Sequence, residues 1–408
     1  MKHRVGLRIV SGFTRDAFAR RNSLRTSLRP LVLVTAFGLS SYLGLYASDA
    51  QLTIIHNFGN GTASNSGTVP NTGLIQAPDG NFYGTAAHNT AGLGGTTYQL
   101  TPNGVLTTIH HFRVTSQKSF SAKLLYYKGE LIAPIITAFQ NTGPLLAATN
   151  LSGEMSMWHQ FTPADGGGPR GSLILGSDGN LYGTCYGGGS GGYGTIYKIN
   201  PTPPYAFSVV YTFSYSSLGI SPAAGLLLAQ DGNYYGTTEI GTTPGGGTIF
   251  QMTPAGQVTF VYHFPGATDY CDSPLIQDKN GNFYGSTIDG GTYRGGYIFK
   301  MSSTFQVTIL HQFGHGTDGS WPNDVVLGPN GNLYGTTIFG GKRRFGTVYE
   351  LSTDGTSYTV LHNFADGTIA NDGKSPEAGL TLGSDNNLYG TTNFGGSAGN
   401  GTAFRISP

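Results

Sequence analysis

The strongest constraint on the fold is an internal repeat of about 50 residues. The segment DGNFYGT at 79–85 returns with small changes at 178–184, 231–237, 280–286, 330–336 and 385–391. A weaker copy, residues 128–132, lies midway through the double-length interval between the first two copies and has lost the Tyr-Gly-Thr. The chain therefore contains seven repeats over residues 52–408, a pattern typical of proteins built from one repeated supersecondary unit.

Each repeat has the pattern of four short strands. In the sixth copy we expect strands at 325–328, 332–337, 346–351 and 358–364, and Asn330-Gly331 suits a two-residue hairpin because both positions need positive φ. The 65 glycines, 24 tyrosines and 23 phenylalanines disfavour helices and favour strands. Four antiparallel strands in about 50 residues form a propeller blade. The sequence predicts an all-β, seven-bladed β-propeller of four-stranded antiparallel blades.

The two ends of the repeat region indicate how the ring closes. The last copy stops after its third strand, whereas residues 52–58 have the pattern of a fourth strand with no repeat before them. Pairing this N-terminal strand into the last blade would remove two open sheet edges. We predict a ring closed by that strand, and a genuine but degenerate second blade within residues 116–162.

Residues 1–50 have the pattern of a signal peptide, which leaves 51–408 as the propeller domain. A basic stretch precedes the apolar run 31–47, and small residues suit cleavage after Ala50. Arg20-Arg21 resembles a twin-arginine signal, although Ser23 stands where that motif usually has Phe. The alternative, an uncleaved anchor, is short for a membrane. We expect a secreted, periplasmic or cell-surface protein with no membrane span in its mature form.

The recurring pattern (D/N)GN(L/F/Y)YGTT…GG…GT(V/I)(Y/F) resembles the GloVer tandem-repeat family of exported bacterial proteins. The resemblance implies export and repeats across residues 52–408, and it implies no particular activity. Members of this family carry variable C-terminal anchors, whereas this sequence stops at Pro408 directly after a strand, which favours a free product. Kelch propellers share the Gly-Gly but repeat a tryptophan, and Trp158 and Trp321 do not recur.

Residues that recur in every repeat are interpreted first as scaffold. A tyrosine series on the second strand should fill the space between blades, with its hydroxyl bonded to backbone. A histidine series on the fourth strand alternates with tyrosine, which favours packed rings over metal ligands. The turns lack the acids of a calcium loop, so we expect neither metal nor cofactor. The two series are Tyr83, Tyr182, Tyr235, Tyr284, Tyr334 and Tyr389, and His56, His110, His159, His311 and His362.

Function is sought where the repeats differ, in the loops before the first strand and after the second. Flat rings beside polar residues suit saccharide stacking, and the basic residues suit an anionic polymer. The alternatives are rings folded onto their own blades and solvated charges. The candidate ligand-binding residues are Trp321, Tyr293, Tyr270, Arg294, Arg343 and Arg344. From residue 51 onward 19 acids exceed 14 bases, which argues against nucleic acid as a partner.

A carboxylate cluster on the same loops offers an enzymatic alternative. Glu239, Asp272 and Asp289, with Asp269 nearby, could act as the acid pair of a glycoside hydrolase. No HExxH or Walker motif is present, and the Gly-rich runs interrupt strands without opening helices, so no GxSxG nucleophile elbow is expected. Cys185 and Cys271 map to rim positions in the third and fifth blades, too far apart in the ring for a disulfide, so free thiols are expected.

The sequence thus predicts an exported, non-catalytic binding or surface-interaction module, expected as a monomer, with polysaccharide or cell-surface glycan as the candidate partner. A carbohydrate-active enzyme is the first alternative, and a purely structural envelope component is the second. The candidate catalytic residues for the enzyme remain Glu239, Asp272 and Asp289.

Overall fold

A computed structural model describes residues 51–61, 67–88, 94–112, 122–135, 144–215, 218–241 and 245–408. The described residues all belong to one compact unit, Ser48–Pro408. The signal peptide, its cleavage point and the twin-arginine resemblance lie outside the described residues.

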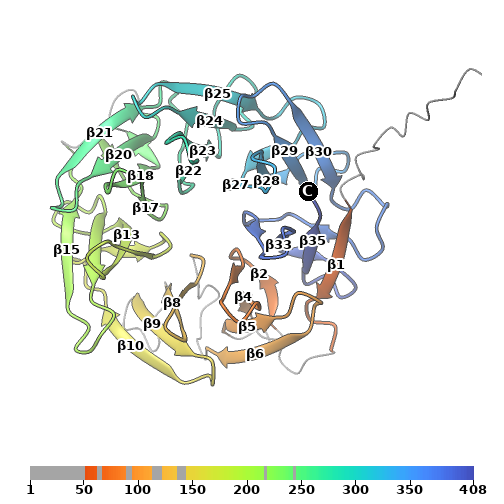
Figure 1. Cartoon of the computed structure of the whole chain (residues 1–408), viewed down its shortest axis with the longest axis horizontal. Helices are drawn as coiled ribbons and strands as arrows, with labels where there is room; N and C mark the ends of the chain where they lie inside the picture. Colours follow the sequence, from red (N-terminus) through yellow and green to blue (C-terminus); the bar gives the residue numbers. More distant parts are fainter. Residues whose placement is uncertain are drawn as a thin grey trace, which may run out of the picture. The chain divides into compact units, whose positions relative to one another are not determined.

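The described residues form strands and no helix, and their sheets are the seven blades of a β-propeller (Figure 1). Blade 1 contains β3 (Ile75–Gln76), β4 (Phe82–His88), β5 (Thr96–Leu100) and β6 (Leu106–His111). Blade 2 contains β7 (Leu125–Tyr127), β8 (Glu130–Ile135), β9 (Leu145–Asn150) and β10 (Met155–Gln160). Blade 3 contains β12 (Ile174–Leu175), β13 (Leu181–Gly187), β14 (Thr195–Ile199) and β15 (Phe207–Thr212). Blade 4 contains β17 (Leu227–Leu228), β18 (Tyr234–Thr238), β20 (Thr248–Met252) and β21 (Val258–His263).

Blade 5 contains β22 (Ile276–Gln277), β23 (Phe283–Thr287), β24 (Tyr297–Met301) and β25 (Val307–Gln312). Blade 6 contains β27 (Val326–Leu327), β28 (Leu333–Phe339), β29 (Thr347–Leu351) and β30 (Tyr358–Asn363). Blade 7 contains β32 (Thr381–Leu382), β33 (Leu388–Thr392), β35 (Thr402–Ile406) and β1 (Leu52–Asn57). Short strands β2 (Thr68–Pro70), β11 (Gly167–Pro169), β16 (Gly219–Ile220) with β19 (Ile240–Gly241), β26 (Ser320–Pro322), and β31 (Gly373–Lys374) with β34 (Phe394–Gly395) extend the loop side of five blades.

Each blade runs from an inner strand a to an outer strand d. The outer strands, β6, β10, β15, β21, β25, β30 and β1, lie on the perimeter in Figure 1, with β17, β22 and β27 near the centre. Because neighbouring strands are antiparallel, the a–b and c–d turns lie at one face and the b–c and d–a loops lie at the other. We call the second face the loop rim.

The DGN turn and the repeated tyrosine form one hydrogen-bonded unit. In blade 1 the Asp79 carboxylate accepts hydrogen bonds from the backbone N and side-chain Nδ2 of Asn81 at 3.0 and 2.9 Å, and from the Tyr83 hydroxyl at 2.7 Å. Burial alone would raise the pKa of Asp79, but the hydrogen bonds from Tyr83 and Asn81 outweigh it and lower the pKa. The tyrosines are buried as predicted, but the bonding partner of the hydroxyl is a carboxylate where we expected backbone.

The same unit recurs in five further blades, with two local changes. Tyr182, Tyr235 and Tyr389 donate to Asp178, Asp231 and Asp385 at 2.8–2.9 Å. In blade 5 the acceptor is Asp278, two residues earlier in the turn, and in blade 6 Asn330 replaces the acid and Tyr334 donates to Glu350 at 2.8 Å. The tyrosine therefore receives an acceptor even where the turn sequence changes.

Apolar side chains from neighbouring blades form shared clusters. The Tyr389 ring of blade 7 lies 4.0 Å from the Phe82 ring of blade 1, and the Tyr235–Phe283 pair joins blades 4 and 5 at 4.5 Å. The cluster that includes Phe82 and Tyr389 also contains Phe58, which follows β1. A blade cannot bury its own faces without its neighbours, so burial requires the closed ring.

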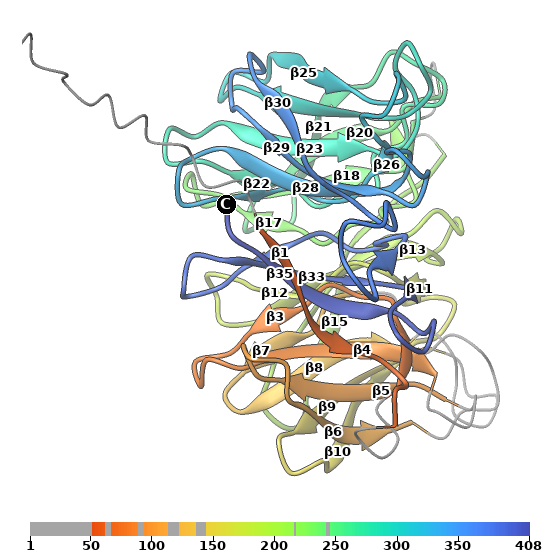
Figure 2. The same ribbon diagram turned by 90° about the vertical axis from the view of Figure 1, so that its right-hand side faces the viewer.

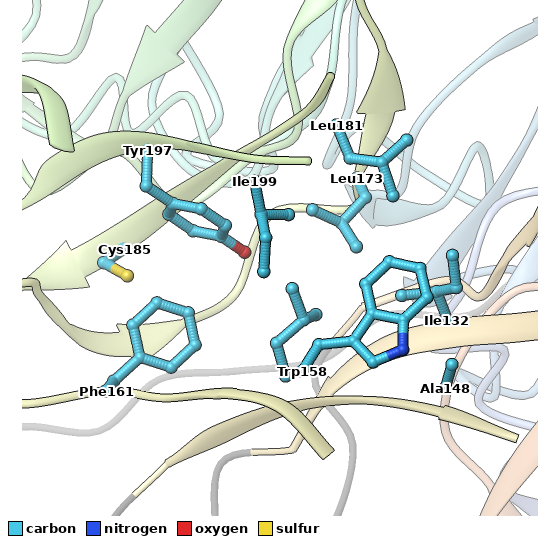
Figure 3. Close-up of a cluster of buried hydrophobic side chains, with 10 residues drawn as sticks. Ile132, Ala148, Trp158, Phe161, Leu173, Leu181, Cys185, Tyr197 and Ile199 are labelled. Atoms are coloured by element: carbon cyan, nitrogen blue, oxygen red, sulfur yellow. The ribbon is translucent and has the colours of Figure 1, made fainter. Parts of the chain in front are cut away.

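Blade 2 is a genuine blade, as predicted from residues 116–162. Ile132 stands where the other repeats have tyrosine, and the Trp158 indole lies beside it between blades 2 and 3 (Figure 3). Trp158 is 5% exposed and stacks on Tyr205 at 4.7 Å. A larger side chain on strand d thus occupies the space that the missing tyrosine leaves.

Histidine and cysteine side chains are part of the scaffold. His362 pairs with Asp372 at 3.0 Å and packs edge-on against Phe364, and His110 bonds the Gly153 carbonyl, so the expected packed rings are confirmed. Cys185 and Cys271 are free, as expected, and both are buried between blades. Burial raises the pKa of the Cys185 thiol to about 12.

The N-terminal strand closes the ring, as predicted. β1 pairs antiparallel with β35 over the register Leu52↔Ile406 to Asn57↔Thr402, and both views place the two strands side by side (Figures 1 and 2). The Asn57 side chain also accepts a hydrogen bond from the Ser397 backbone at 2.8 Å. One strand thus supplies the outer edge of blade 7 and leads directly into blade 1.

Deleting residues 51–58 should lower the free energy of unfolding by several kcal/mol, on the order of 3 or more, because β35 then loses its partner strand and Phe58 leaves its cluster. Chemical denaturation of the deletion variant, compared with the full chain, measures the change. An unchanged unfolding midpoint would contradict closure by β1.

Candidate functional site

A cavity of about 280 Å³ lies at the loop-rim end of the channel. Its wall is built from one short segment of every blade, the residues directly before strand a. These lining residues are Asn71–Gly73, Ala122–Lys123, Arg170 and Ser172, Ala223–Gly225, Asp272–Pro274, Pro322–Asp324 and Glu377–Gly379, with Glu239 and Ile288 from the segments after strand b. A ring of seven repeats thus encloses one common site.

Hydroxyl groups of strand b hold this wall in place. Thr184 donates to the Ala224 carbonyl at 2.8 Å, and Thr336 donates to the Ala378 carbonyl at 3.0 Å. Each bond joins one blade to the lining segment of the next. The Thr of the repeated YGTT therefore positions lining residues that the repeat pattern itself does not specify.

An ion pair crosses the cavity. Lys123 Nζ of blade 2 lies 2.9 Å from Asp324 Oδ2 of blade 6, although these blades are not neighbours. A Cβ at Gly73 would lie 2.0 Å from Lys123 Cε, and one at Gly379 would lie 1.9 Å from Asp324 Oδ1. Glycine at these two positions leaves the space that the Lys123 and Asp324 side chains occupy.

Two of the predicted acids line the same cavity. Glu239 of blade 4 and Asp272 of blade 5 both line it, as does Arg170 of blade 3, whose guanidinium lies 4.3 Å from the Tyr186 ring centroid. Burial, reinforced by the negative charge of Glu239, raises the pKa of Asp272 to about 6. A carboxyl group with this pKa can exchange a proton near neutral pH.

The remaining predicted acids do not reach the cavity lining. Asp289 accepts a hydrogen bond from the Gly290 backbone in the b–c loop of blade 5. Asp269 is buried and accepts from the backbone of Gly266 and Gly291, so it stabilises the loops around it. Among the described residues no cluster of three or more His, Cys, Asp or Glu side chains is arranged to hold a metal ion.

Sequence reasoning missed four charged lining residues, Lys123, Arg170, Asp324 and Glu377. Their signal is positional. Lys123 and Asp324 stand directly before the first apolar residue of strand a, where three other repeats have glycine. When the repeats are aligned, a charged residue at a position where other repeats have glycine could have indicated the channel wall.

The predicted ligand-binding residues lie on the loop rim of blades 5 and 6. Trp321, in β26, is 42% exposed and packs edge-on against Phe339 at 5.2 Å. Tyr293 is exposed and contacts His315, and Tyr270 is half-buried. The exposed Arg294, Arg343 and Arg344 lie in the b–c loops. None of these six lines the cavity, although Pro322, next to Trp321, does.

The family of the chain is shown by its sequence. The model of the Gloeobacter/Verrucomicrobia repeat matches residues 34–241, 136–324 and 222–408. The chain belongs to the Gloeobacter/Verrucomicrobia repeat family. The overlapping matches confirm the predicted tandem-repeat membership and extend across the propeller. No curated protein matches the sequence.

Solved structures similar to this member of the repeat family share little sequence identity with it. A Bacteroides uniformis protein provisionally described as a 6-phosphogluconolactonase has a TM-score of 0.50 and 14% identity over 77% of this chain and 96% of its own. A protein of unknown function from Bacteroides thetaiotaomicron has a TM-score of 0.46 and 11% identity, covering 82% and 90%. A luciferin-regenerating enzyme has a TM-score of 0.45 and 13% identity, covering 88% and 95%. The similarity to the Bacteroides uniformis protein concerns the fold alone.

Across the part of the chain that the structure describes, no helix has the length and apolar character needed to cross a bilayer.

The pKa of Asp272 predicts a pH-dependent stability. It rises from an ordinary 3.8 to about 6 in the fold, so between these values the folded protein holds a proton that the unfolded chain has released. The stabilisation is complete below pH 3.8 and is lost as the pH rises through 6. Asp272→Asn should therefore unfold at a higher temperature than the parent at pH 7.5, and the gain in its free energy of unfolding should be no more than roughly 3 kcal/mol.

Thermal unfolding at pH 4.5 and 7.5 measures this difference, with Glu239→Gln as the coupled variant. Removing the charge of Glu239 should weaken the pH dependence, because that charge contributes to the raised pKa of Asp272. A stability difference that is the same at both pH values would contradict the assignment.

Proposed function

We propose that this protein is an exported binding module that takes a saccharide unit in the cavity at the loop-rim end of the channel. The observation that carries the proposal is the convergence of ionisable side chains from six blades on that cavity. They are Lys123, Arg170, Glu239, Asp272, Asp324 and Glu377.

The lining chemistry suits a ligand rich in hydroxyl groups. Lys123 and Arg170 donate hydrogen bonds, whereas Glu239 and Asp324 accept them, and sugar hydroxyls do both. Ligand pockets usually measure about 300–1,000 Å³, so a cavity of about 280 Å³ fits one or two sugar rings rather than a long chain.

Export is the second part of the proposal. It is supported by the basic and apolar pattern of residues 1–50 and by the cleavage signal at Ala50. The exported protein would act as a monomer outside the cytoplasm. Cell fractionation followed by N-terminal sequencing tests the location and the cleavage point together.

Binding to a glycan array tests the function. Ala223→Phe should place a ring in the cavity and lower the affinity for any array ligand by at least about tenfold, because the ligand and the ring compete for one space. Tyr215→Phe, at an exposed position outside the cavity, is the matched control and should keep the parent affinity. An array with no bound glycan would favour the structural envelope component.

A second candidate function, a carbohydrate-active hydrolase or lyase, is favoured by one observation. Asp272 has a raised pKa and shares the cavity with Glu239, as an acid and its partner carboxylate would. If the protein cleaves a glycan, Asp272→Asn and Glu239→Gln should each abolish turnover and leave binding of the intact substrate nearly unchanged. Product formation from a bound oligosaccharide, measured by chromatography, decides between catalysis and binding.

A further inference from the structure

Three exposed side chains on the loop rim of blades 5 and 6 have a left-handed backbone. The φ values are 54° for Arg294, 59° for Trp321 and 64° for Arg344. A residue with a Cβ is disfavoured in this region, and bulky residues are uncommon there. Unfavourable backbone conformations that persist in exposed loops often belong to functional side chains.

The fold does not require arginine at these positions. Arg294 and Arg344 are equivalent, and each backbone N donates to the carbonyl of a glycine three residues earlier, at 3.4 and 3.3 Å. Blades 3 and 7 make the same bond with Gly192 and Gly399, whose φ values are 82° and 76°. Glycine satisfies the same backbone geometry without strain, so the two arginines serve a purpose other than the loop fold.

Trp321 is a similar case. The equivalent residues Val69, Gly168, Ser221 and Ser375 have φ values of 51–63°, so the position imposes the left-handed backbone in each of these blades. Tryptophan is the largest side chain at this position and is 42% exposed. Packing against Phe339 leaves part of the indole accessible to solvent.

These side chains form one continuous surface. The Trp321 backbone N donates to the Gly295 carbonyl beside Arg294 at 2.8 Å, which joins blade 6 to blade 5. Phe339 and Phe345 are 43% and 39% exposed. We define the basic-aromatic rim as Arg294, Trp321, Phe339, Arg343, Arg344 and Phe345. Lys374 of blade 7 extends it, with Nζ 4.8 Å from the Phe345 ring centroid.

We propose that the basic-aromatic rim binds an acidic polysaccharide, a polymer of uronate or sulfated sugar units. Half-exposed rings offer flat faces on which sugar rings can stack, and the adjacent guanidinium groups can pair with carboxylate or sulfate groups. Arg294 and Arg344 recur at equivalent positions of neighbouring blades, as a polymer with regularly repeated charges requires for several simultaneous contacts.

The charge of the rest of the protein sharpens this preference. From residue 51 onward acids exceed bases by 19 to 14, so the basic-aromatic rim is a local exception on an acidic chain. Such an asymmetry orients the molecule toward a polyanion. The Trp321 ring packs against Phe339, and the Phe345 ring packs against Lys374, so neither ring projects freely from the surface. This arrangement favours stacking of a polymer over insertion into a lipid surface.

The inference rests on the proposed function in taking a saccharide ligand, but it concerns a surface separate from the cavity. Binding should be measured to polygalacturonate, with neutral dextran and with vesicles containing half phosphatidylglycerol as comparison ligands. Trp158 is buried, so a change in tryptophan fluorescence on addition of polymer reports mainly on Trp321.

The decisive variants are Arg294→Gly and Arg344→Gly, which adopt the residue of blades 3 and 7 at the equivalent position. Each should weaken polygalacturonate binding about three- to tenfold and reduce its salt dependence, because one paired cation is removed. Their melting temperatures should be unchanged or higher, because the unfavourable φ is relieved. Trp321→Gly should remove the fluorescence response as well as weaken binding.

Lys128→Gly is the matched control. Lys128 is also basic and also has positive φ, at 50°, but it lies in the a–b turn of blade 2, on the face opposite the rim. The affinity of the Lys128→Gly variant for polygalacturonate should equal that of the parent. An equal loss in Lys128→Gly, a fall in melting temperature for the rim variants, or tighter binding to the vesicles than to polygalacturonate would overturn the proposal. Binding of neutral glycans on the array together with no polygalacturonate binding would refute the rim and leave the cavity proposal standing.

Discussion

Shared burial between neighbouring blades is the constraint on which the rest of this structure depends. A four-stranded blade exposes two apolar faces, and each face is covered only by the next blade. The tyrosine of strand b lies at the centre of this contact, as the Tyr389–Phe82 and Tyr182–Tyr234 pairs show. Because a linear array would leave both ends uncovered, β1 must pair with β35 before either terminal blade is stable.

The same contact also builds the cavity. Hydroxyl groups of strand b bond the lining segment of the next blade, so every blade that packs correctly also places a short segment at the channel. The scaffold determines where the lining backbone lies, whereas the identity of each lining side chain remains free. Charged residues such as Lys123 and Asp324 can therefore occupy the wall without affecting the repeat that holds them.

Much of the fold could be predicted because its determinants are local and repeated. The Asp-Gly-Asn turn, the tyrosine and the Gly-Thr before strand c recur, so their spacing gives the strands, the blades and their number. The register of the repeats was enough to predict blade 2. It did not show that Trp158 fills the space left by the missing tyrosine, because Ile132 and Trp158 are 26 positions apart and meet only across a packed interface. The carboxylate partner of the tyrosine hydroxyl was likewise hidden, although Asp79 and Tyr83 lie in one turn.

The sequence by itself determined the all-β class, the seven blades and closure by the N-terminal strand, because period-two patterning, turn chemistry and an incomplete last repeat are local properties. Only the tertiary structure decided which acids share a site. Glu239 and Asp272 meet at the cavity while Asp289 stays in its loop, and Lys123 reaches Asp324 from a blade that is not its neighbour. Distances across a ring depend on how the blades pack around the axis, and no spacing along one chain records them.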